Sequence, residues 1–134
     1  MSEIKVKITI TNNELDAIWF FQSETQGKLE ASSCEKYFES YTKHANHFHA
    51  LCEKLKARKS LATKVHVTEE EIEAIEDFRG ETADILEGTF NVEYKQDFER
   101  HDRYFSRLKI KFKKARGKAT VKRALEIAAQ RKLR

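Results

Sequence analysis

The fold is decided by two related stretches of the chain, ITITNNELDAIWFFQSET at residues 8–25 and VHVTEEEIEAIEDFRGET at residues 65–82. The match extends without a gap over residues 7–57, where 16 of 51 positions carry the same residue 57 places later. Two unrelated segments of ordinary composition would share about three. We therefore interpret the chain as a tandem duplication of one 57-residue unit.

Each copy opens with a short strand and the start of a helix. Apolar residues alternate with polar ones, as in a strand with one buried face; they are Ile4, Val6, Ile8 and Ile10 in the first copy and Val65 and Val67 in the second. A Thr-x-x-Glu spacing follows, at Thr11 and Glu14 and again at Thr68 and Glu71. This capping box satisfies free amides at a helix start, so we expect helices to begin here.

The first helix of each copy should run to about Glu30 and Glu87. Its apolar stripe recurs every three or four residues and comprises Leu15, Ile18, Phe21, Thr25 and Leu29, matched by Ile72, Ile75, Phe78, Thr82 and Leu86. The second helix has the alternating spacing of a heptad, formed by Tyr37, Tyr41, His44, Phe48, Leu51 and Leu55 and by Tyr94, Phe98, His101, Phe105, Leu108 and Phe112. This spacing predicts that the two long helices pack side by side.

The end of the second long helix admits two interpretations. The segment 108–112 alternates apolar residues with lysines, as a strand does, but Phe112 aligns with Leu55, which favours a helix. Gly117 should then break the chain. A final basic helix should follow over residues 120–133, with an apolar side formed by Val121, Ala124, Leu125 and Ala128.

These elements predict an α-rich α+β fold built from two β-α-α units. We divide the chain into a first unit at residues 1–60, a second unit at 61–115 and a basic C-terminal tail or helix at 116–134, together one compact domain. Neither unit can bury its strand and both stripes alone. The units should therefore form a pseudo-dimer within one chain, in which the two strands pair into a small sheet and the two long helices cross.

The chain carries a net charge of +4 that is unevenly divided. From Arg107 to the C-terminus there are 12 Lys or Arg against one acid, Glu126, while residues 1–106 hold 14 basic and 21 acidic residues. The C-terminal part is therefore +11 and the body −7. Such asymmetry bears on partners rather than on fold.

Phosphates are the commonest cellular target for a basic segment of this density. Since aromatic side chains for base stacking are scarce there, contacts should be made to the nucleic-acid backbone with little sequence preference. The candidate nucleic-acid-binding residues are Lys109, Lys111, Lys113, Lys114, Arg116, Lys118, Lys122, Arg123, Arg131, Lys132 and Arg134. The alternative is a tail that is solvated or folded back onto the acidic body.

A second candidate surface is the aromatic pair Trp19-Phe20. The helical stripe places Trp19 at the edge of the buried face and Phe20 nearly opposite it, and the matching residues 57 places later are Glu76 and Asp77. An aromatic pair exposed in one copy only suggests a partner-binding surface. The alternative is that the tail helix or the N-terminal strand of the same molecule covers it.

Two groups of residues invite a metal or catalytic interpretation. The first is the cluster His44, His47, His49 and Cys52. Its pairs have helical ligand spacing but do not converge on one face, and of its histidines only His44 recurs, as His101. If His44 and His101 meet at the two-fold axis, they form a pH-sensitive pair. The second group, the acidic run over residues 69–77, fits a solvated helix start. We expect no metal site and no cofactor.

The sequence has none of the standard catalytic signatures, because it lacks a phosphate loop, a dinucleotide fingerprint, a nucleophile elbow and a paired-Cys metal motif. It has two cysteines, Cys34 and Cys52, and no apolar run of membrane-spanning length. We therefore expect a cytoplasmic protein without a disulfide and without a membrane partner.

The leading interpretation is a small, non-enzymatic cytosolic protein that binds nucleic acid through its basic end. The runner-up is a protein-interaction module, a regulator or inhibitor that grips a partner protein through the acidic body and the Trp19-Phe20 pair. A weaker third is a metal- or His-dependent enzyme around His44 and His101. The absence of Pro would suit a phage or mobile-element protein, and association into a homo-oligomer is left open.

Overall fold

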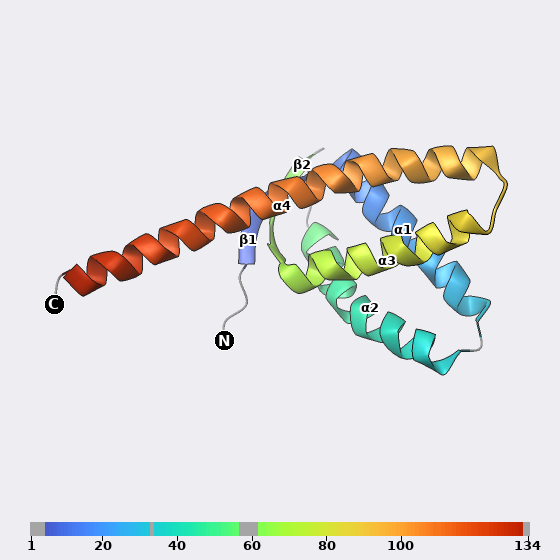
Figure 1. Cartoon of the computed structure of the whole chain (residues 1–134), viewed down its shortest axis with the longest axis horizontal. Helices are drawn as coiled ribbons and strands as arrows, with labels where there is room; N and C mark the ends of the chain where they lie inside the picture. The colour runs from blue at the N-terminus through green and yellow to red at the C-terminus, as the bar shows by residue number, and fades with distance from the viewer. Residues whose placement is uncertain (1–4, 33, 57–61, 133–134) are drawn as a thin grey trace.

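The computed structural model describes residues 5–32, 34–56 and 62–132, which form four helices and a two-stranded sheet (Figure 1). In chain order the elements are β1 (Lys5–Thr11), α1 (Asn12–Glu30), α2 (Glu35–Lys56), β2 (Ala62–Thr68), α3 (Glu69–Glu87) and α4 (Val92–Lys132). This architecture agrees with the expected α-rich α+β class. No helix within the described ranges is long and apolar enough to cross a membrane.

The two strands pair in an antiparallel sheet, as the alternating patterns predict. Ile8 stands opposite Val65, the residue 57 places later, and Val6 stands opposite Val67. The apolar side chains of both strands are buried beneath the helices, whereas His66 is exposed. The strand residue Ile4 lies outside the described residues.

Both first helices begin with a complete capping box. The Thr11 hydroxyl accepts from the Glu14 amide while the Glu14 carboxylate accepts from the Thr11 amide, and Thr68 and Glu71 repeat this arrangement. Both carboxylates are buried, at 3% exposure for Glu14 and 2% for Glu71. A buried carboxylate is costly unless it is paired, so each box requires a cation as well.

A lysine from a long helix supplies that cation to each box. Lys54 of α2 places its Nζ atom 2.8 and 2.9 Å from the two oxygens of Glu71 and 2.8 Å from the carbonyl oxygen of His66. Lys111 of α4 donates to Glu14 and, at 2.6 Å, to the carbonyl oxygen of Thr9. These two Lys–Glu clamps join α2 to the start of α3 and α4 to the start of α1.

The centre of the molecule is the crossing of α1 and α3 (Figure 1). Ala17 and Ala74 are fully buried, and their small side chains permit a close approach of the two helices. The hydroxyl of Thr25 lies 3.0 Å from the carbonyl oxygen of Phe78, and the hydroxyl of Thr82 lies 3.4 Å from that of Phe21. The predicted apolar stripes of both helices face this core.

The two long helices do not pack side by side, so this prediction was wrong. Figure 1 shows α2 and α4 on opposite sides of the α1–α3 pair. Tyr41 and Phe48 of α2 pack on Phe78 of α3, whereas Phe98 and Phe105 of α4 pack on Phe21 of α1. A heptad spacing defines an apolar stripe but not the surface that covers it, and here each stripe is covered by a shorter helix.

The predicted break at Gly117 is also wrong. Helix α4 runs without interruption from Val92 to Lys132, so residues 120–132 continue the second long helix and are not a separate element. Phe112 is buried and the segment 108–112 is helical, as the alignment with Leu55 predicted. One glycine weakens a helix by only about 1 kcal/mol relative to alanine, which good helix formers on both sides outweigh.

The boundaries drawn from the sequence are not tested by this architecture. The boundary between the two units, at residues 60 and 61, lies outside the described residues. The boundary between the second unit and the tail, at residues 115 and 116, falls inside α4.

Replacement of Glu71 by alanine should lower the free energy of unfolding by about 2–4 kcal/mol, because Lys54 and the backbone amide of Thr68 lose a buried partner. Chemical denaturation of the purified protein measures this change. The matched control is Glu73→Ala on the exposed face of the same helix, which should change stability by less than about 0.5 kcal/mol. Equal effects of the two substitutions would contradict the clamp.

Replacement of Gly117 by alanine tests the continuity of α4. A Cβ atom at this position meets nothing within 4 Å, so the substitution should strengthen the helix by about 0.5–1 kcal/mol. We expect the helical ellipticity at 222 nm to rise or stay unchanged. A loss of ellipticity would indicate that Gly117 adopts a conformation that alanine cannot, and that the helix is broken there.

Candidate functional site

The C-terminal end of α4 projects from the body as a single helix (Figure 1). Ala115 and Ala119 are the last described residues of α4 that pack against the core, and every side chain from 121 to 131 is exposed. At 1.5 Å per residue, the 13 residues after Ala119 extend about 20 Å beyond the body. An unsupported helix of this length is marginal in water. This projecting end, residues 120–132, is therefore the part of the described structure that contact with a partner would stabilise most.

Three of the predicted nucleic-acid-binding residues are instead used within the molecule. Lys109 pairs with Glu76 at 3.3 Å, Arg116 pairs with Glu69 at 2.7 Å, and Lys111 forms the clamp on Glu14. In this part of α4 the basic segment therefore packs onto the acidic body, as the alternative interpretation predicted.

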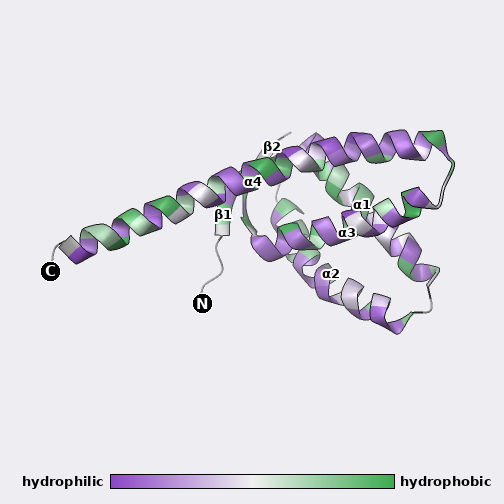
Figure 2. Ribbon diagram, in the orientation of Figure 1, coloured by the Kyte–Doolittle hydropathy of each residue, from purple (hydrophilic) through white to green (hydrophobic). Residues whose placement is uncertain are grey.

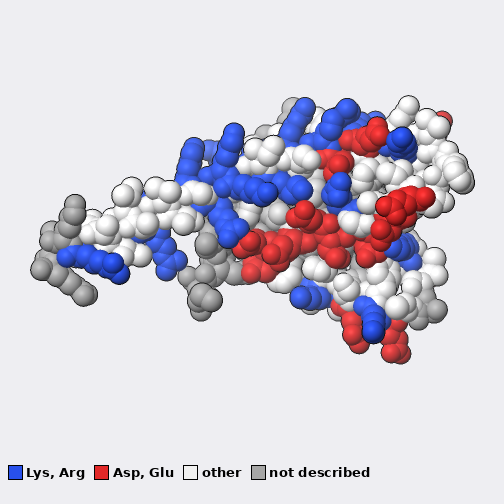
Figure 3. Space-filling model, in the orientation of Figure 1, with Lys and Arg blue, Asp and Glu red and all other residues white. Residues whose placement is uncertain are grey.

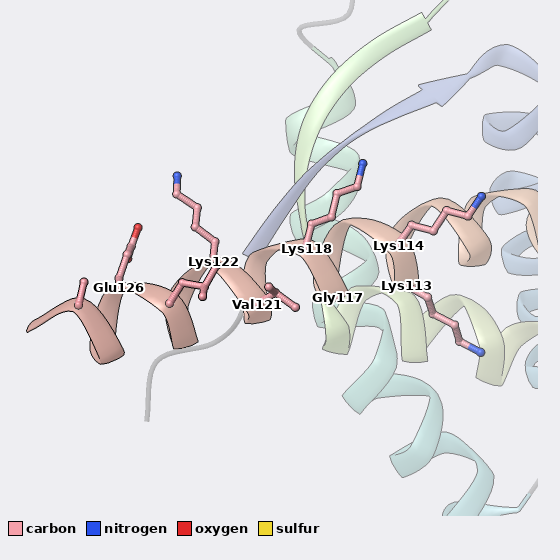
Figure 4. A pocket seen from close by; sticks show the side chains of 9 residues that line it. Lys113, Lys114, Gly117, Lys118, Val121, Lys122 and Glu126 are labelled. Atoms are coloured by element: carbon pink, nitrogen blue, oxygen red, sulfur yellow. The ribbon is translucent and has the colours of Figure 1, made fainter. Parts of the chain in front are cut away.

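Six further predicted residues are exposed and make no ion pair with any described residue. They are Lys113, Lys114, Lys118, Lys122, Arg123 and Arg131. Figure 4 shows Lys114, Lys118 and Lys122, on successive turns, directed to one side of α4, with Lys113 directed to the other. Of the remaining two, Lys132 is the last residue of α4 and Arg134 lies outside the described residues.

The basic surface also begins earlier in α4 than the charge division suggested. Arg103 and Arg107 are exposed on the body half of the helix, and the Arg107 guanidinium lies 5.8 Å from the centre of the Tyr104 ring. At 100° per residue, these two arginines share a face with Lys114 and Lys118. Figure 3 shows basic side chains gathered along the middle of α4, with fewer on its projecting end. Arg107 belongs to the basic stretch counted from the sequence but not to the candidate residues, and Arg103 precedes that stretch. Helical spacing would have added both arginines to the candidate site.

The acidic run at the start of α3 is largely structural. Glu71 is buried in its clamp, and Glu69 and Glu76 pair with basic residues of α4. Asp77 lies 3.7 Å from the Nε2 atom of His44. Burial and the charge of Glu81 raise the pKa of Asp77, while His44 opposes that shift. Figure 3 shows the remaining acidic side chains as a band over α3. The expected solvated helix start is therefore correct only for the exposed members of the run.

The two seam histidines do not meet, so the predicted pH-sensitive pair is wrong. His44 lies against Asp77 and Phe78 of α3, whereas His101 stacks on Phe20 of α1 with ring centres 4.2 Å apart and planes 4° apart. The Nδ1 atom of His101 lies 2.7 Å from the carbonyl oxygen of Asp97. The histidines are separated because α2 and α4 pack on different helices.

The described residues show no geometry that supports a metal site. Among the side chains that the structure describes, no group of three or more His, Cys, Asp or Glu residues could hold a metal ion. Cys34 is exposed, Cys52 is buried, and no disulfide joins them.

The aromatic pair divides between two environments. Phe20 is partly buried beneath α4, where it stacks on His101 and lies 6.1 Å from the ring of Tyr94. Its predicted exposure was wrong because the long helix covers it. Trp19 remains 46% exposed and places its edge against Phe48 of α2, with ring centres 5.5 Å apart. A groove between α1 and α2 runs beside it.

Comparison of the chain with protein-family models, with curated proteins and with solved structures finds no match in any of the three. Function is therefore inferred from the geometry alone.

The projecting end of α4 should exchange its amide hydrogens much faster than the rest of that helix. We expect amides 121–131 to exchange about 100-fold faster than amides 98–112, because no described part of the body covers them. Hydrogen exchange followed by mass spectrometry measures the difference. Uniform protection along α4 would show that this end is covered, within the molecule or by another copy.

Proposed function

We propose that the chain is a duplicated β-α-α unit folded as an intrachain pseudo-dimer, and that it serves as a small, non-enzymatic, cytoplasmic protein that binds the nucleic-acid backbone through α4. The observation that carries the binding proposal is the projecting helix with exposed basic side chains that lack an acidic partner among the described residues.

The duplication is supported by contacts that recur 57 residues apart. Lys54 clamps Glu71 as Lys111 clamps Glu14. Thr25 reaches the carbonyl of Phe78 as Thr82 reaches that of Phe21. Each of these contacts joins one half of the chain to the other, as an interface with two-fold symmetry does. The long helix of each half packs on the short helix of the other, which supports a pseudo-dimer with exchanged helices.

Backbone-directed binding is supported by the kind of side chain that α4 exposes. The face shared by Arg103, Arg107, Lys114 and Lys118 spans 16 residues, or about 24 Å. A duplex presents one phosphate charge per about 1.7 Å of its axis, so a basic helix of this length can neutralise several phosphates at once. The projecting end has no aromatic residue to stack on bases, which supports weak sequence preference.

The salt dependence of binding tests the proposal. For the double variant Lys118→Gln/Lys122→Gln, the slope of log affinity against log salt should fall by about 2 in magnitude, because two fewer phosphates are neutralised. Fluorescence anisotropy with a labelled duplex at several salt concentrations measures the slope. We use substitutions rather than a shortened chain, because α4 packs against the core as far as Ala119.

The matched control is Lys36→Gln/Lys43→Gln, which removes the same charge from exposed positions on α2, across the α1–α3 pair from α4. This variant should keep the slope of the unmodified protein. Equal losses in both variants would show that only net charge matters, and no binding at low salt would overturn the proposal.

A further inference from the structure

The two halves of the molecule differ most beside Trp19. The groove between α1 and α2 has Phe48 and Cys52, both buried, among its lining residues, with Trp19, Tyr41 and Ala45 beside them. It is an apolar hollow of about 390 Å³ on a body that is otherwise densely charged.

The corresponding surface of the other half, between α3 and α4, is bridged by two ion pairs. Arg79 donates two hydrogen bonds to Asp102, which raises the pKa of the guanidinium, and Lys109 pairs with Glu76. The cations also lie over Phe98 and Phe105. These side chains bridge the space between the helices and cover the aromatic rings below.

None of the four bridging residues occurs at the matching positions of the first half. Glu76 and Lys109 correspond to Trp19 and Cys52, while Arg79 and Asp102 correspond to Gln22 and Ala45. The small Ala45 leaves the space that the Arg79–Asp102 bridge occupies in the other half. In the first half the Gln22 amide donates a hydrogen bond to the Tyr41 hydroxyl across the two helices, at 3.0 Å. Beside this bond an aromatic and largely apolar surface is left exposed where the second half carries two ion pairs.

A second exposed apolar surface lies on the projecting end of α4. Val121 and Leu125 are 59% and 66% exposed and stand one turn apart, on a face that continues through Ala128. Figure 2 shows hydrophobic residues continuing along this end of the helix. Lys118 and Lys122 flank the face, as Figure 4 shows for its first turns.

The occupant of the groove cannot be the same molecule's own helix end. Helix α4 is continuous and lies across the α1–α3 pair from α2, so it cannot turn back to the far side of α1. A second copy can supply it, since the projecting end extends clear of its own body. The charges are complementary as well, because the helix end is basic and the body is −7 overall.

We propose that the projecting end of α4 of one copy seats Val121 and Leu125 in the Trp19 groove of a second copy. Each copy then offers one groove and one helix end, so the contact is head-to-tail and leads either to closed rings, of which a reciprocal pair is the smallest, or to open chains. One helix end buries less surface than a standard interface, so the association is weak and depends on protein concentration.

Two complementary variants test this proposal without nucleic acid. Trp19→Glu, which introduces the residue type found at position 76, removes the groove and keeps the helix end. Val121→Gln/Leu125→Gln removes the apolar face and keeps the groove and every charge. In sedimentation equilibrium the unmodified protein should gain mass with concentration and each variant alone should stay monomeric. An equimolar mixture of the two should form a one-to-one complex that does not grow further.

The single tryptophan provides a second readout. In the mixture only the Val121→Gln/Leu125→Gln variant carries Trp19, so its emission should shift to shorter wavelength as the Trp19→Glu variant is added. If Trp19→Glu does not fold, Ala45→Asp replaces it in the sedimentation test and should fill the groove in the same way.

Three outcomes would overturn the proposal: an unmodified protein that stays monomeric at every concentration, single variants that still associate, or a mixture that forms no complex. A Trp19→Glu variant that still associates would point to pairing of two helix ends, and a Val121→Gln/Leu125→Gln variant that still associates would point to pairing of two grooves. None of these outcomes bears on phosphate binding, which depends on Lys118 and Lys122 and is measured separately.

Discussion

The arrangement of the molecule depends on two buried carboxylates. Glu14 and Glu71 close the capping boxes of α1 and α3 at the place where each helix leaves the sheet, and both are almost fully removed from water. A carboxylate in that position needs a cation as well as the threonine amide that donates to it. Lys111 and Lys54 supply it, and each also caps a strand carbonyl. Because each lysine belongs to the other half of the chain, the clamps fix which helix lies on which.

From this constraint follows the exchange of the long helices. Once α2 is tied to α3 and α4 to α1, the aromatic seams face Phe78 and Phe21 rather than one another, and Phe20 comes to lie under α4. Residues at the clamps and at the α1–α3 crossing are the same in both halves of the chain. The halves differ at the surfaces, where one half closes the space between its helices with ion pairs and the other leaves a groove beside Trp19.

The same helix that completes the core also carries the surface we assign to function. Lys109, Lys111 and Arg116 hold α4 to the acidic residues of α1 and α3. Beyond Ala119 no described part of the body packs against the helix, and the basic and apolar side chains of residues 121–131 are exposed together. Part of the basic charge of α4 is thus paired with acidic residues within the molecule. The basic side chains of α4 that make no such ion pair are concentrated toward its projecting end. Its basic flanks suit phosphates, and its apolar face suits a groove such as the one beside Trp19.

The sequence by itself determined most of the secondary structure, the two helix starts and the buried stripes, because these depend on local spacing and on capping within four residues. The pairing of the strands was predicted from the repeat, which gives the chain two half-buried strands that can share one sheet. It also identified most of the basic residues of α4, although it missed Arg103 and Arg107. Only the tertiary structure decided the partners: that α2 and α4 lie apart, that His44 and His101 do not meet, and that α4 passes through Gly117. An apolar stripe specifies that a helix face is buried but not against what. That choice is made by the buried Lys–Glu clamps, which join residues 17 and 97 positions apart.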